Sequence, residues 1–518
     1  LADDRLLCVF STQGTDTQGQ QIAPHRLQHF DSMPKPVSLP DGTLAALFLD
    51  HHGPGLPPTP GQQSFYARYS TDHGATWGPP EALFDLPASE GGFGYFVPLV
   101  DQQGEIHLLV LCDARTGVIR PWPSGTGEPA VEPLARQRLD VWHVRSKDQR
   151  SDWTKPRCIW EGRAGDLQSV TQLSSGRIVL PLSYLVQRSW SNRGKGPSAF
   201  TYAGQFDTTV LYSDDGQNWT KSASVLRTAT PNLSAYGAVE PVVVELNDGR
   251  VWMLLRTQLG RFYQSYSEDG SDWSAAEPTQ IRSSDSPAAL LKTRAGKLVM
   301  LWNNCQRHPY AQGSRHVLHA AISHDDGQTW TGYREVLRDP LRKAPPPPSG
   351  DHGVSYPFAT EAADGSIVYS LWVQTGEGRS LEKFHPEWLE ETCVVEDFNN
   401  GMDSWSTFGT QGVELVSHPM NNERHVLQLR RTSSDWPTAA VWNFPKASSG
   451  RLKLRLLREE DPPALRLELA NHFSPPFDRE SQYHSLYQAA FGSGNDGHDV
   501  KVSAGAWRDV ELAWDGDA

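Results

Sequence analysis

The sequence predicts an all-β protein that consists of a six-bladed β-propeller followed by a smaller antiparallel β-sandwich. Three observations predict this fold class. A short motif of the form Ser-x-Asp-x-Gly-x-Thr-Trp recurs along the chain, six hairpin signals lie between apolar segments, and helical periodicity is weak throughout. Radial repetition of a four-stranded sheet is the propeller architecture, which leaves only short, protected strand edges.

The recurring motif predicts a tight turn between two strands. It is clearest at Ser70–Trp77 and Ser323–Trp330, with looser copies at Tyr212–Trp219 and Tyr266–Trp273 and a decayed copy at Ser146–Trp153. The carboxylate accepts backbone N–H bonds, the glycine takes positive φ, and the tryptophan packs under the turn. In the looser copies the alignment places Asp214 and Glu268 at the carboxylate position. We therefore interpret these acidic residues as structural rather than catalytic.

The hairpin signals interleave with the motif and place one four-stranded sheet in each repeat. Each signal is a polar turn that contains glycine and precedes an apolar, β-rich strand. The glycines are Gly42, Gly104, Gly176, Gly249, Gly296 and Gly365.

The repeat stops near residue 390, which predicts a second domain. Segments such as Arg451–Leu456 and Leu465–Leu469 alternate in polarity, as strands of an antiparallel β-sandwich do. The predicted domains are a catalytic propeller over residues 1–390 and an accessory sandwich over 391–518, whose abrupt end at Ala518 leads us to expect that the natural protein continues.

Composition excludes several classes of partner. The net charge of -14 argues against binding to nucleic acid. No run of about 18 apolar residues is present, so no membrane span is expected. The five cysteines form no Cys-x-x-Cys pair, and we expect neither a metal site nor a cofactor. The chain starts at Leu1 without an apolar signal segment, which suits a trimmed mature protein; we expect a secreted or periplasmic location.

Equivalent positions on the innermost strands follow from the hairpin register. Nine residues before the six glycines lie Met33, Tyr95, Leu167, Glu240, Pro287 and Tyr356. Three of these residues carry polar groups able to do chemistry, where core strands would carry apolar side chains. Tyr95, Glu240 and Tyr356 are therefore candidates to line the central cavity.

The recurring Ser-x-Asp-x-Gly-x-Thr-Trp motif, placed on a six-unit β repeat, resembles the sialidase (neuraminidase) superfamily over about residues 25–385. Within this resemblance, the segment around Tyr356 is similar to the one that carries the tyrosine nucleophile, and the segment around Glu240 to the one that carries its glutamate partner. Arg256 resembles one arginine of the family's carboxylate-binding triad. A carboxylate can take the tyrosine proton during attack, and arginine binds a substrate carboxylate in a bidentate way.

Structural readings of the same three residues stay open at this point. Tyr356 could be a core tyrosine whose hydroxyl is satisfied, and Glu240 could form a purely structural ion pair with Arg256. Arg256 itself could be a solvated strand arginine.

The sequence departs from the sialidase pattern in the first blade. Ser32 stands where the family's first arginine should be, and Lys35 or Arg26 could substitute from other positions. Arg282 is a guess for the third arginine, and His352 is expected to face the cavity. The resemblance places the acid/base aspartate on the loop that begins at Asp50.

That loop offers three candidates for the acid/base group. Asp50 is its only carboxylate, and His51 and His52 follow it directly. A histidine titrates near neutral pH and can serve the same purpose.

Three functions compete. The first is an exo-acting glycoside hydrolase that releases sialic acid or a related acidic sugar from a sialoglycoconjugate or other acidic glycan. The second is a polysaccharide lyase acting on uronate-containing polysaccharide, which the absent first arginine and the histidine-rich loop favour. The third is a non-catalytic glycan-binding propeller.

Overall fold

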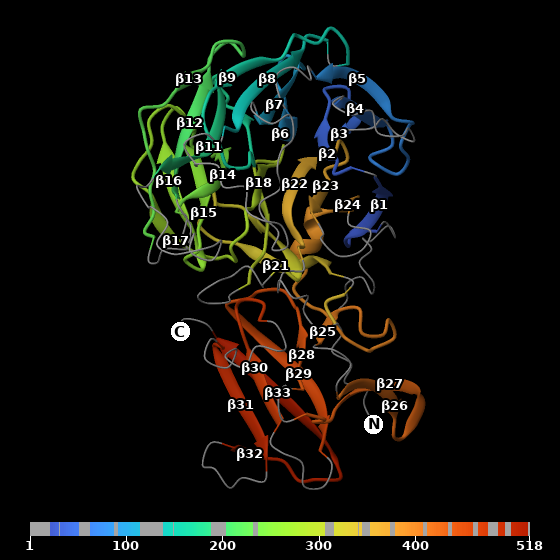
Figure 1. The fold of residues 1–518 in the computed structure, drawn as a ribbon. Helices are drawn as coiled ribbons and strands as arrows, with labels where there is room; N and C mark the ends of the chain where they lie inside the picture. The colour runs from blue at the N-terminus through green and yellow to red at the C-terminus, as the bar shows by residue number, and fades with distance from the viewer. Residues whose placement is uncertain are drawn as a thin grey trace, which may run out of the picture.

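Apolar strands separated by short polar turns build six four-stranded antiparallel sheets, which Figure 1 shows arranged as blades around a common centre. The computed structural model describes residues 21–30, 32–50, 63–86, 92–113, 138–148, 150–187, 204–230, 237–305, 315–339, 341–343, 353–372, 379–407, 412–433, 438–458, 465–474, 485–492 and 499–515. The predicted six-bladed propeller is confirmed.

The first three blades run from an innermost to an outermost strand in chain order. Blade 1 holds β2 (Lys35–Ser38), β3 (Leu44–Asp50), β4 (Gln63–Ser70) and β5 (Glu81–Leu86). Blade 2 holds β6 (Gly92–Val100), β7 (Ile106–Asp113), β8 (Asp140–Ser146) and β9 (Arg157–Trp160). Blade 3 holds β10 (Thr171–Gln172), β11 (Ile178–Gln187), β12 (Gly204–Ser213) and β13 (Thr220–Lys221).

The last three blades follow the same plan, except that the final blade takes its outermost strand from the start of the chain. Blade 4 holds β14 (Val239–Glu245), β15 (Val251–Arg256), β16 (Arg261–Ser267) and β17 (Glu277–Arg282). Blade 5 holds β18 (Ala289–Lys292), β19 (Leu298–Trp302), β20 (Val317–Ser323) and β21 (Thr331–Arg338). Blade 6 holds β22 (Ser355–Glu361), β23 (Ile367–Trp372), β24 (Ser380–Phe384) and β1 (His25–His29).

The ring closes where the two ends of the propeller sequence meet. Strand β1 pairs antiparallel with β24, with His25 opposite Lys383 and His29 opposite Ser380. In Figure 1 the blue β1 lies beside the orange β24. This pairing hides the edge of β24, which would otherwise offer unpaired backbone groups to another chain.

One hydrophobic cluster fills each space between neighbouring blades. Between blades 1 and 2, for example, Leu47 and Phe65 pack with Phe93 and Leu108. Equivalent clusters lie at the other five blade interfaces of the described chain. Each sheet is thus buried on both faces, so its strands read as apolar runs such as Val251–Leu255, with every residue buried.

The recurring motif forms the expected turns, with one correction. In the first copy Asp72 accepts hydrogen bonds from Thr76 N at 2.8 Å and Ser70 Oγ at 2.7 Å, and Trp77 donates to Gly74 O at 2.9 Å. Hydrogen bonds from the Thr76 side chain and backbone, together with the one from Ser70, lower the pKa of Asp72 to about 2.

In the two looser copies the carboxylate that closes the turn lies one residue later than the alignment predicts. Asn218 N donates to Asp215 and Ser271 N donates to Asp269, so the assignments to Asp214 and Glu268 are wrong. In the first copy the serine and the glycine are four positions apart, whereas in each looser copy they are three positions apart, so these two turns are one residue shorter.

The C-terminal region consists of small sheets. Its strands are β25 (Trp405–Thr407), β26 (Val413–His418), β27 (Asn421–Leu429), β28 (Ala440–Trp442), β29 (Ser449–Leu457), β30 (Leu465–Leu469), β31 (Tyr487–Gly492), β32 (Asp499–Lys501) and β33 (Trp507–Asp515). They form two-stranded antiparallel sheets and one three-stranded sheet, in which β31 and β32 pair in parallel, unlike the expected all-antiparallel arrangement. A short 3-10 helix, η4 (Pro386–Glu390), precedes this region.

Polar contacts attach the C-terminal region to blade 5. The Asn443 side chain donates to Tyr333 O at 3.0 Å and accepts from Glu335 N at 3.1 Å. Phe473 N donates to Asn304 O at 2.8 Å. Across the described segments, no helix has the length and apolarity that crossing a membrane would take.

Candidate functional site

β-Bulges aim the central polar side chains. The pairing of β14 with β15 shifts register between Val239 and Val242, and that of β22 with β23 shifts between Ser355 and Phe358. Glu240 and Tyr356 lie inside these bulges, with φ of 45° and 58°. Positive φ is strained for both residue types and is sustained by the surrounding blade. A bulge re-aims a side chain that regular pairing would direct into the blade interface.

Tyr356, Glu240 and Arg256 form one hydrogen-bonded group. Tyr356 Oη lies 3.0 Å from Glu240 Oε1, and Arg256 Nη1 lies 2.9 Å from Tyr356 Oη. Arg256 Nη1 also contacts Glu240 Oε2. Because a guanidinium can only donate, the tyrosine oxygen accepts from Arg256 and directs its own hydrogen at Glu240. The group is therefore arranged for proton transfer from Tyr356 to Glu240.

The protonation state of Tyr356 follows from its surroundings. Burial raises its pKa well above the usual value, while the charge of Arg256 lowers it and that of Glu240 raises it. Burial dominates, so the phenol keeps its proton at neutral pH. Attack by this oxygen would require Glu240 to accept the proton as the new bond forms.

Asp285 holds two arginines beside the tyrosine. Arg256 Nε donates to Asp285 Oδ1 at 2.7 Å, and Arg315 Nη2 donates to the Asp285 carbonyl oxygen. The guanidinium carbons of Arg256 and Arg315 lie 5.8 and 5.5 Å from the Tyr356 ring centroid. Two cationic groups thus adjoin the candidate nucleophile, as recognition of an anionic sugar would need.

Arg315 is a residue that the sequence reasoning missed. Its buried side chain lies next to Tyr356, whereas Arg282, the predicted third arginine, ends β17, the outermost strand of blade 4. Burial and the neighbouring charge of Arg261 lower the pKa of Arg282. Arg315 lies two residues before β20, outside the register that the hairpin glycines define, so the count from those glycines could not identify it.

Asp166 is the second residue that the sequence reasoning missed. It lies directly before Leu167, the counted inner position of blade 3, and is half-buried. Burial and the charge of Glu240 together raise the pKa of Asp166 to about 7, against the charges of Arg256, Lys35 and Arg163, which lower it. The described chain provides no hydrogen-bond partner for this carboxyl group.

The first blade contributes a buried lysine. Lys35 Nζ donates to Phe96 O and lies 3.4 Å from the ring centroid of Phe358 and 5.3 Å from that of Tyr95. Burial lowers its pKa well below the usual value, although the charge of Asp166 raises it. Ser32, which the resemblance predicts at the position of the first arginine, is half-buried.

Tyr95 and Arg26 have different places. The Tyr95 ring centroid lies 6.3 Å from that of Tyr356, so the two predicted inner tyrosines come together. Arg26 lies on β1, the outermost strand of blade 6, and pairs with Glu382 at 3.2 Å. The structure thus places Lys35 near the centre and Arg26 at the rim.

The side chains of the predicted acid/base candidates, and of His352, which is predicted to face the cavity, fall outside what the structure describes. His51, His52 and His352 lie outside the described residues. Asp50 ends strand β3, and its side chain is likewise outside the description. Their roles stay predictions.

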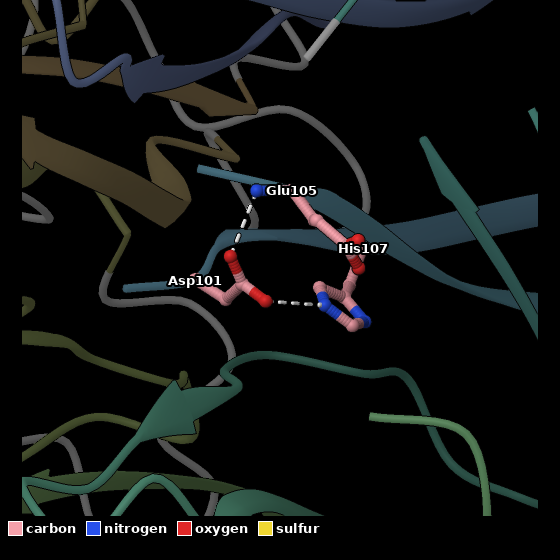
Figure 2. A group of neighbouring side chains, drawn as sticks. All are labelled: Asp101, Glu105 and His107. Carbon is pink, nitrogen blue, oxygen red and sulfur yellow. Dashed lines mark hydrogen bonds and ion pairs between the residues drawn. The ribbon is translucent and has the colours of Figure 1, made fainter. Parts of the chain in front are cut away.

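Asp101, Glu105 and His107 form a cluster with metal-ligand chemistry at the hairpin of blade 2 (Figure 2). Its donor atoms already have partners. Asp101 Oδ1 accepts from Glu105 N at 2.7 Å, Asp101 Oδ2 lies 3.2 Å from His107 Nε2, and Glu105 accepts from Arg145 at 2.7 Å. We interpret the cluster as a cap on the turn.

A chain of hydrogen bonds continues from this cap into blade 3. Trp219 Nε1 lies 3.3 Å from His143 Nδ1, and His143 Nε2 lies 3.0 Å from His107 Nδ1. Because indole only donates, we assign the proton of His143 to Nε2 and that of His107 to Nε2, which points at Asp101. Both imidazoles are neutral, and burial lowers the pKa of His143 to about 3.

A separate cavity of about 560 Å³ lies at the rim of the propeller. Arg26 and Glu382 of blade 6, Arg338 of blade 5 and Trp388 of η4 line it. It does not contain Tyr356, Glu240 or Arg256, so it is distinct from the central site.

Comparison with known proteins supports the fold and the repeat. The chain is 27% identical over 382 residues to a sialidase from Micromonospora viridifaciens, a match that covers 68% of this chain and 51% of that protein. The chain therefore spans about half the length of this curated relative.

The chain also matches solved structures, among them a Hadza microbial sialidase, Hz136, with 18% identity and a TM-score of 0.49, covering 69% of this chain and 66% of that one. A protein of unknown function from Dyadobacter fermentans has 18% identity and a TM-score of 0.48, covering 70% and 96%. The NanB sialidase from Streptococcus pneumoniae has 14% identity and a TM-score of 0.47, covering 71% and 72%.

The profile of a BNR repeat-like domain matches residues 97–369, which is more than half of the chain. This stretch runs from β6 in blade 2 to β23 in blade 6. It includes Tyr356, Glu240 and Arg256. The chain therefore belongs to the BNR repeat-like domain family, as a member with a sialidase-like six-bladed propeller.

Proposed function

We propose that the protein is an exo-acting glycoside hydrolase that releases terminal sialic acid or a related acidic sugar from glycans. The observation that carries the proposal is the hydrogen bond of 3.0 Å from Tyr356 Oη to Glu240, made while Arg256 donates to the same tyrosine oxygen. A structural tyrosine needs one partner for its hydroxyl group. Here a base and a cation meet at a strained, bulged position, as activation of a nucleophile requires.

The roles follow from this geometry. Tyr356 attacks the anomeric carbon while its proton passes to Glu240. Arg256 and Arg315 bind the substrate carboxylate beside that carbon. A phenol is a suitable nucleophile here because it is neutral before attack and so is not repelled by the carboxylate of the sugar.

Removal of the Tyr356 hydroxyl tests the proposal. Wild-type protein should release the fluorophore from an aryl sialoside, and Tyr356→Phe should lower kcat/KM by about 10²-fold or more, because neither a nucleophile nor a proton transfer to Glu240 remains.

Tyr369→Phe is the matched control for this change. Its hydroxyl donates to Val336 O of the neighbouring blade 5 at 3.0 Å, in the packed interface between blades 5 and 6, so its loss should lower the stability and leave the kinetics near those of the wild type. Absence of turnover by the wild type, or equal turnover by Tyr356→Phe, would contradict the proposal.

The lyase alternative has a distinct product. The half-buried Ser32 in place of the first arginine is the observation that favours it. A lyase would form an unsaturated uronate, which absorbs ultraviolet light, from a uronate-containing polysaccharide. Product formation there, without turnover of the sialoside, would replace the hydrolase proposal. Glycan binding without any product would support a non-catalytic propeller.

We further propose a secreted or periplasmic location, with residues 1–390 as the catalytic part and 391–518 as the accessory part. The disulfide state of Cys393 supports this location, because structural disulfides are typical of oxidising compartments.

A further inference from the structure

The central site of the described chain contains three carboxyl groups, and two of them are already engaged. Glu240 accepts from Tyr356 and contacts Arg256. Asp285 is fully buried and accepts from Arg256 at 2.7 Å. Asp166 is half-buried and finds no hydrogen-bond partner among the described residues. It is therefore the carboxyl group left available to a bound molecule.

Hydrogen bonds on both sides of Asp166 fix its place between the two bulged residues. On one side, Gly165 N donates to Ser183 O at 2.8 Å, and Ser183 Oγ accepts from Glu240 N at 3.4 Å. On the other side, Gln168 Nε2 donates to Pro357 O at 3.1 Å. Pro357 directly follows Tyr356, so the segment that carries Asp166 bridges blade 4 and blade 6.

The close approach at Ser183 depends on a glycine. A Cβ atom added to Gly165 would lie 2.3 Å from Ser183 Oγ, which is closer than atoms pack. The segment before Asp166 is therefore seated against the residue that contacts Glu240. A larger side chain at position 165 would therefore displace both this segment and Ser183.

Charged and titratable groups surround Asp166 from five strands and from its own segment. These groups are Glu240 on β14, Arg256 on β15, Lys35 on β2, Arg163 in the same segment, Tyr95 on β6 and Tyr356 on β22. Burial together with the charge of Glu240 outweighs the three cations and raises the pKa of Asp166 to about 7. A carboxyl group with this pKa holds its proton through the mildly acidic range, as a general acid must.

We propose that Asp166 is the general acid/base of this site, an inference that rests on the proposed hydrolase. As the bond between the anomeric carbon and the leaving oxygen breaks, that oxygen takes the bonding electron pair and the proton of Asp166. Tyr356 Oη bonds to the anomeric carbon, and its proton goes to Glu240. In the second half, Asp166 takes a proton from water, the water oxygen replaces Tyr356 at the carbon, and Glu240 returns the proton to the phenolate.

The leaving group distinguishes this role from a structural one. An aryl leaving group departs without protonation, whereas a sugar alcohol needs it. Asp166→Asn should therefore lower kcat/KM on sialyllactose by about 10²- to 10⁴-fold, and on an aryl sialoside by about tenfold or less. For the wild type, kcat/KM on sialyllactose should decline above pH of about 7, and the variant should lack this decline.

Asp140→Asn is the matched control. Asp140 is a buried carboxylate of blade 2 that pairs with Arg138 and accepts from Gly162 N at 2.9 Å, away from the central strands. Its loss should leave the ratio between the two substrates unchanged. Thermal unfolding of each variant shows that the protein is folded.

The outcomes separate the acid role from the hydrolase. If the wild type hydrolyses both sialosides and Asp166→Asn loses both equally, or neither, the hydrolase stands and the acid role is refuted. If the wild type hydrolyses neither, the hydrolase is refuted and the acid role falls with it. A selective loss on sialyllactose together with loss of the alkaline decline supports the acid role.

Discussion

Tyr356 receives a hydrogen bond from a cation and gives one to a carboxylate, and this direction of donation determines its chemistry. For a phenol that only packs in a core, the identity of the group that accepts its hydrogen would have no chemical consequence. Here Arg256 donates a hydrogen bond to the tyrosine oxygen, and Glu240 accepts the hydrogen of the tyrosine hydroxyl. The attacking oxygen is therefore stabilised as it gains negative charge, and its proton already has an acceptor.

The sequence indicated the central group of residues but missed two of its neighbours for a geometric reason. The count from each hairpin glycine finds residues on the innermost strands, and it correctly brought Tyr95, Glu240 and Tyr356 together. Arg315 comes from the residues before β20, a third strand, so this count cannot reach it. Asp166 is one position from the counted Leu167 and precedes β10, where strand alternation no longer determines direction.

Buried neutral histidines should make the fold sensitive to acid. Burial lowers the pKa of His143 and of His319 to about 3, and Asn304 N donates to His319 Nδ1 at 3.3 Å, which requires the neutral ring. In the unfolded chain each imidazole takes up a proton near pH 6.5. Their contribution to stability is therefore complete above that pH and is lost as the pH falls. At pH 5 each should cost about 2 kcal/mol of the free energy of unfolding.

The titration of Asp166 changes the free energy of unfolding with pH in the opposite direction, so its effect must be removed before the histidines are tested. Its folded pKa of about 7 exceeds the unfolded value, so its contribution to stability is complete below the unfolded pKa and is lost as the pH rises to 7. Urea unfolding of Asp166→Asn at pH 7 and pH 5 isolates the histidines. A free energy of unfolding that stays level or rises toward pH 5 would rule out the neutral buried imidazoles.

At the scale of strands, the bulges in β14 and β22 are the feature that turns a core position into a site. The sequence showed the hairpins and turns, because glycine and aspartate mark them directly. It did not show the bulges, since Glu240 and Tyr356 adopt positive φ only under the constraint of the completed blade. The one-residue shift of the motif carboxylates to Asp215 and Asp269 escaped the sequence for a similar reason, because turn length is decided by local packing.

Two glycines that flank β14, one before the strand and one in the hairpin after it, allow a controlled test of the strand that carries Glu240. Gly237 and Gly249 both have φ of +89°, but a Cβ atom at Gly237 would lie 2.6 Å from Phe206 O, whereas one at Gly249 meets nothing within 4 Å. Gly249→Ala should cost about 1 kcal/mol from backbone strain alone. Gly237→Ala should cost about 1–3 kcal/mol more and also lower kcat/KM, because the clash moves the start of β14.

Denaturant unfolding and sialoside kinetics of the two variants check this expectation. Gly249→Ala serves as the control for Gly237→Ala because both positions have the same φ, so the backbone strain of the substitution is the same and only the clash with Phe206 differs. Equal stabilities, or unchanged kinetics for a destabilised Gly237→Ala, would show that the entry to β14 does not position Glu240.

At the scale of the whole molecule, ring closure allows residues far apart in the sequence to form one site. Tyr356 and Arg256 meet through side chains on blades 6 and 4 because the intervening blade packs between them through hydrophobic clusters on both faces. Pairing of β1 with β24 completes the circle. The fold class was predictable because repetition is visible in one sequence, whereas the identity of the acid/base group depends on how the ring brings single residues together.

The most direct test of the central claim is a crystal structure of the protein with a sialic-acid-like transition-state analogue. We predict that the analogue binds at the centre of the propeller, with its carboxylate on Arg256 or Arg315 and with Tyr356 Oη beneath the carbon that corresponds to the reacting one. An analogue bound only in the rim cavity beside Arg26 and Arg338, or one whose carboxylate contacts neither central arginine, would contradict the account.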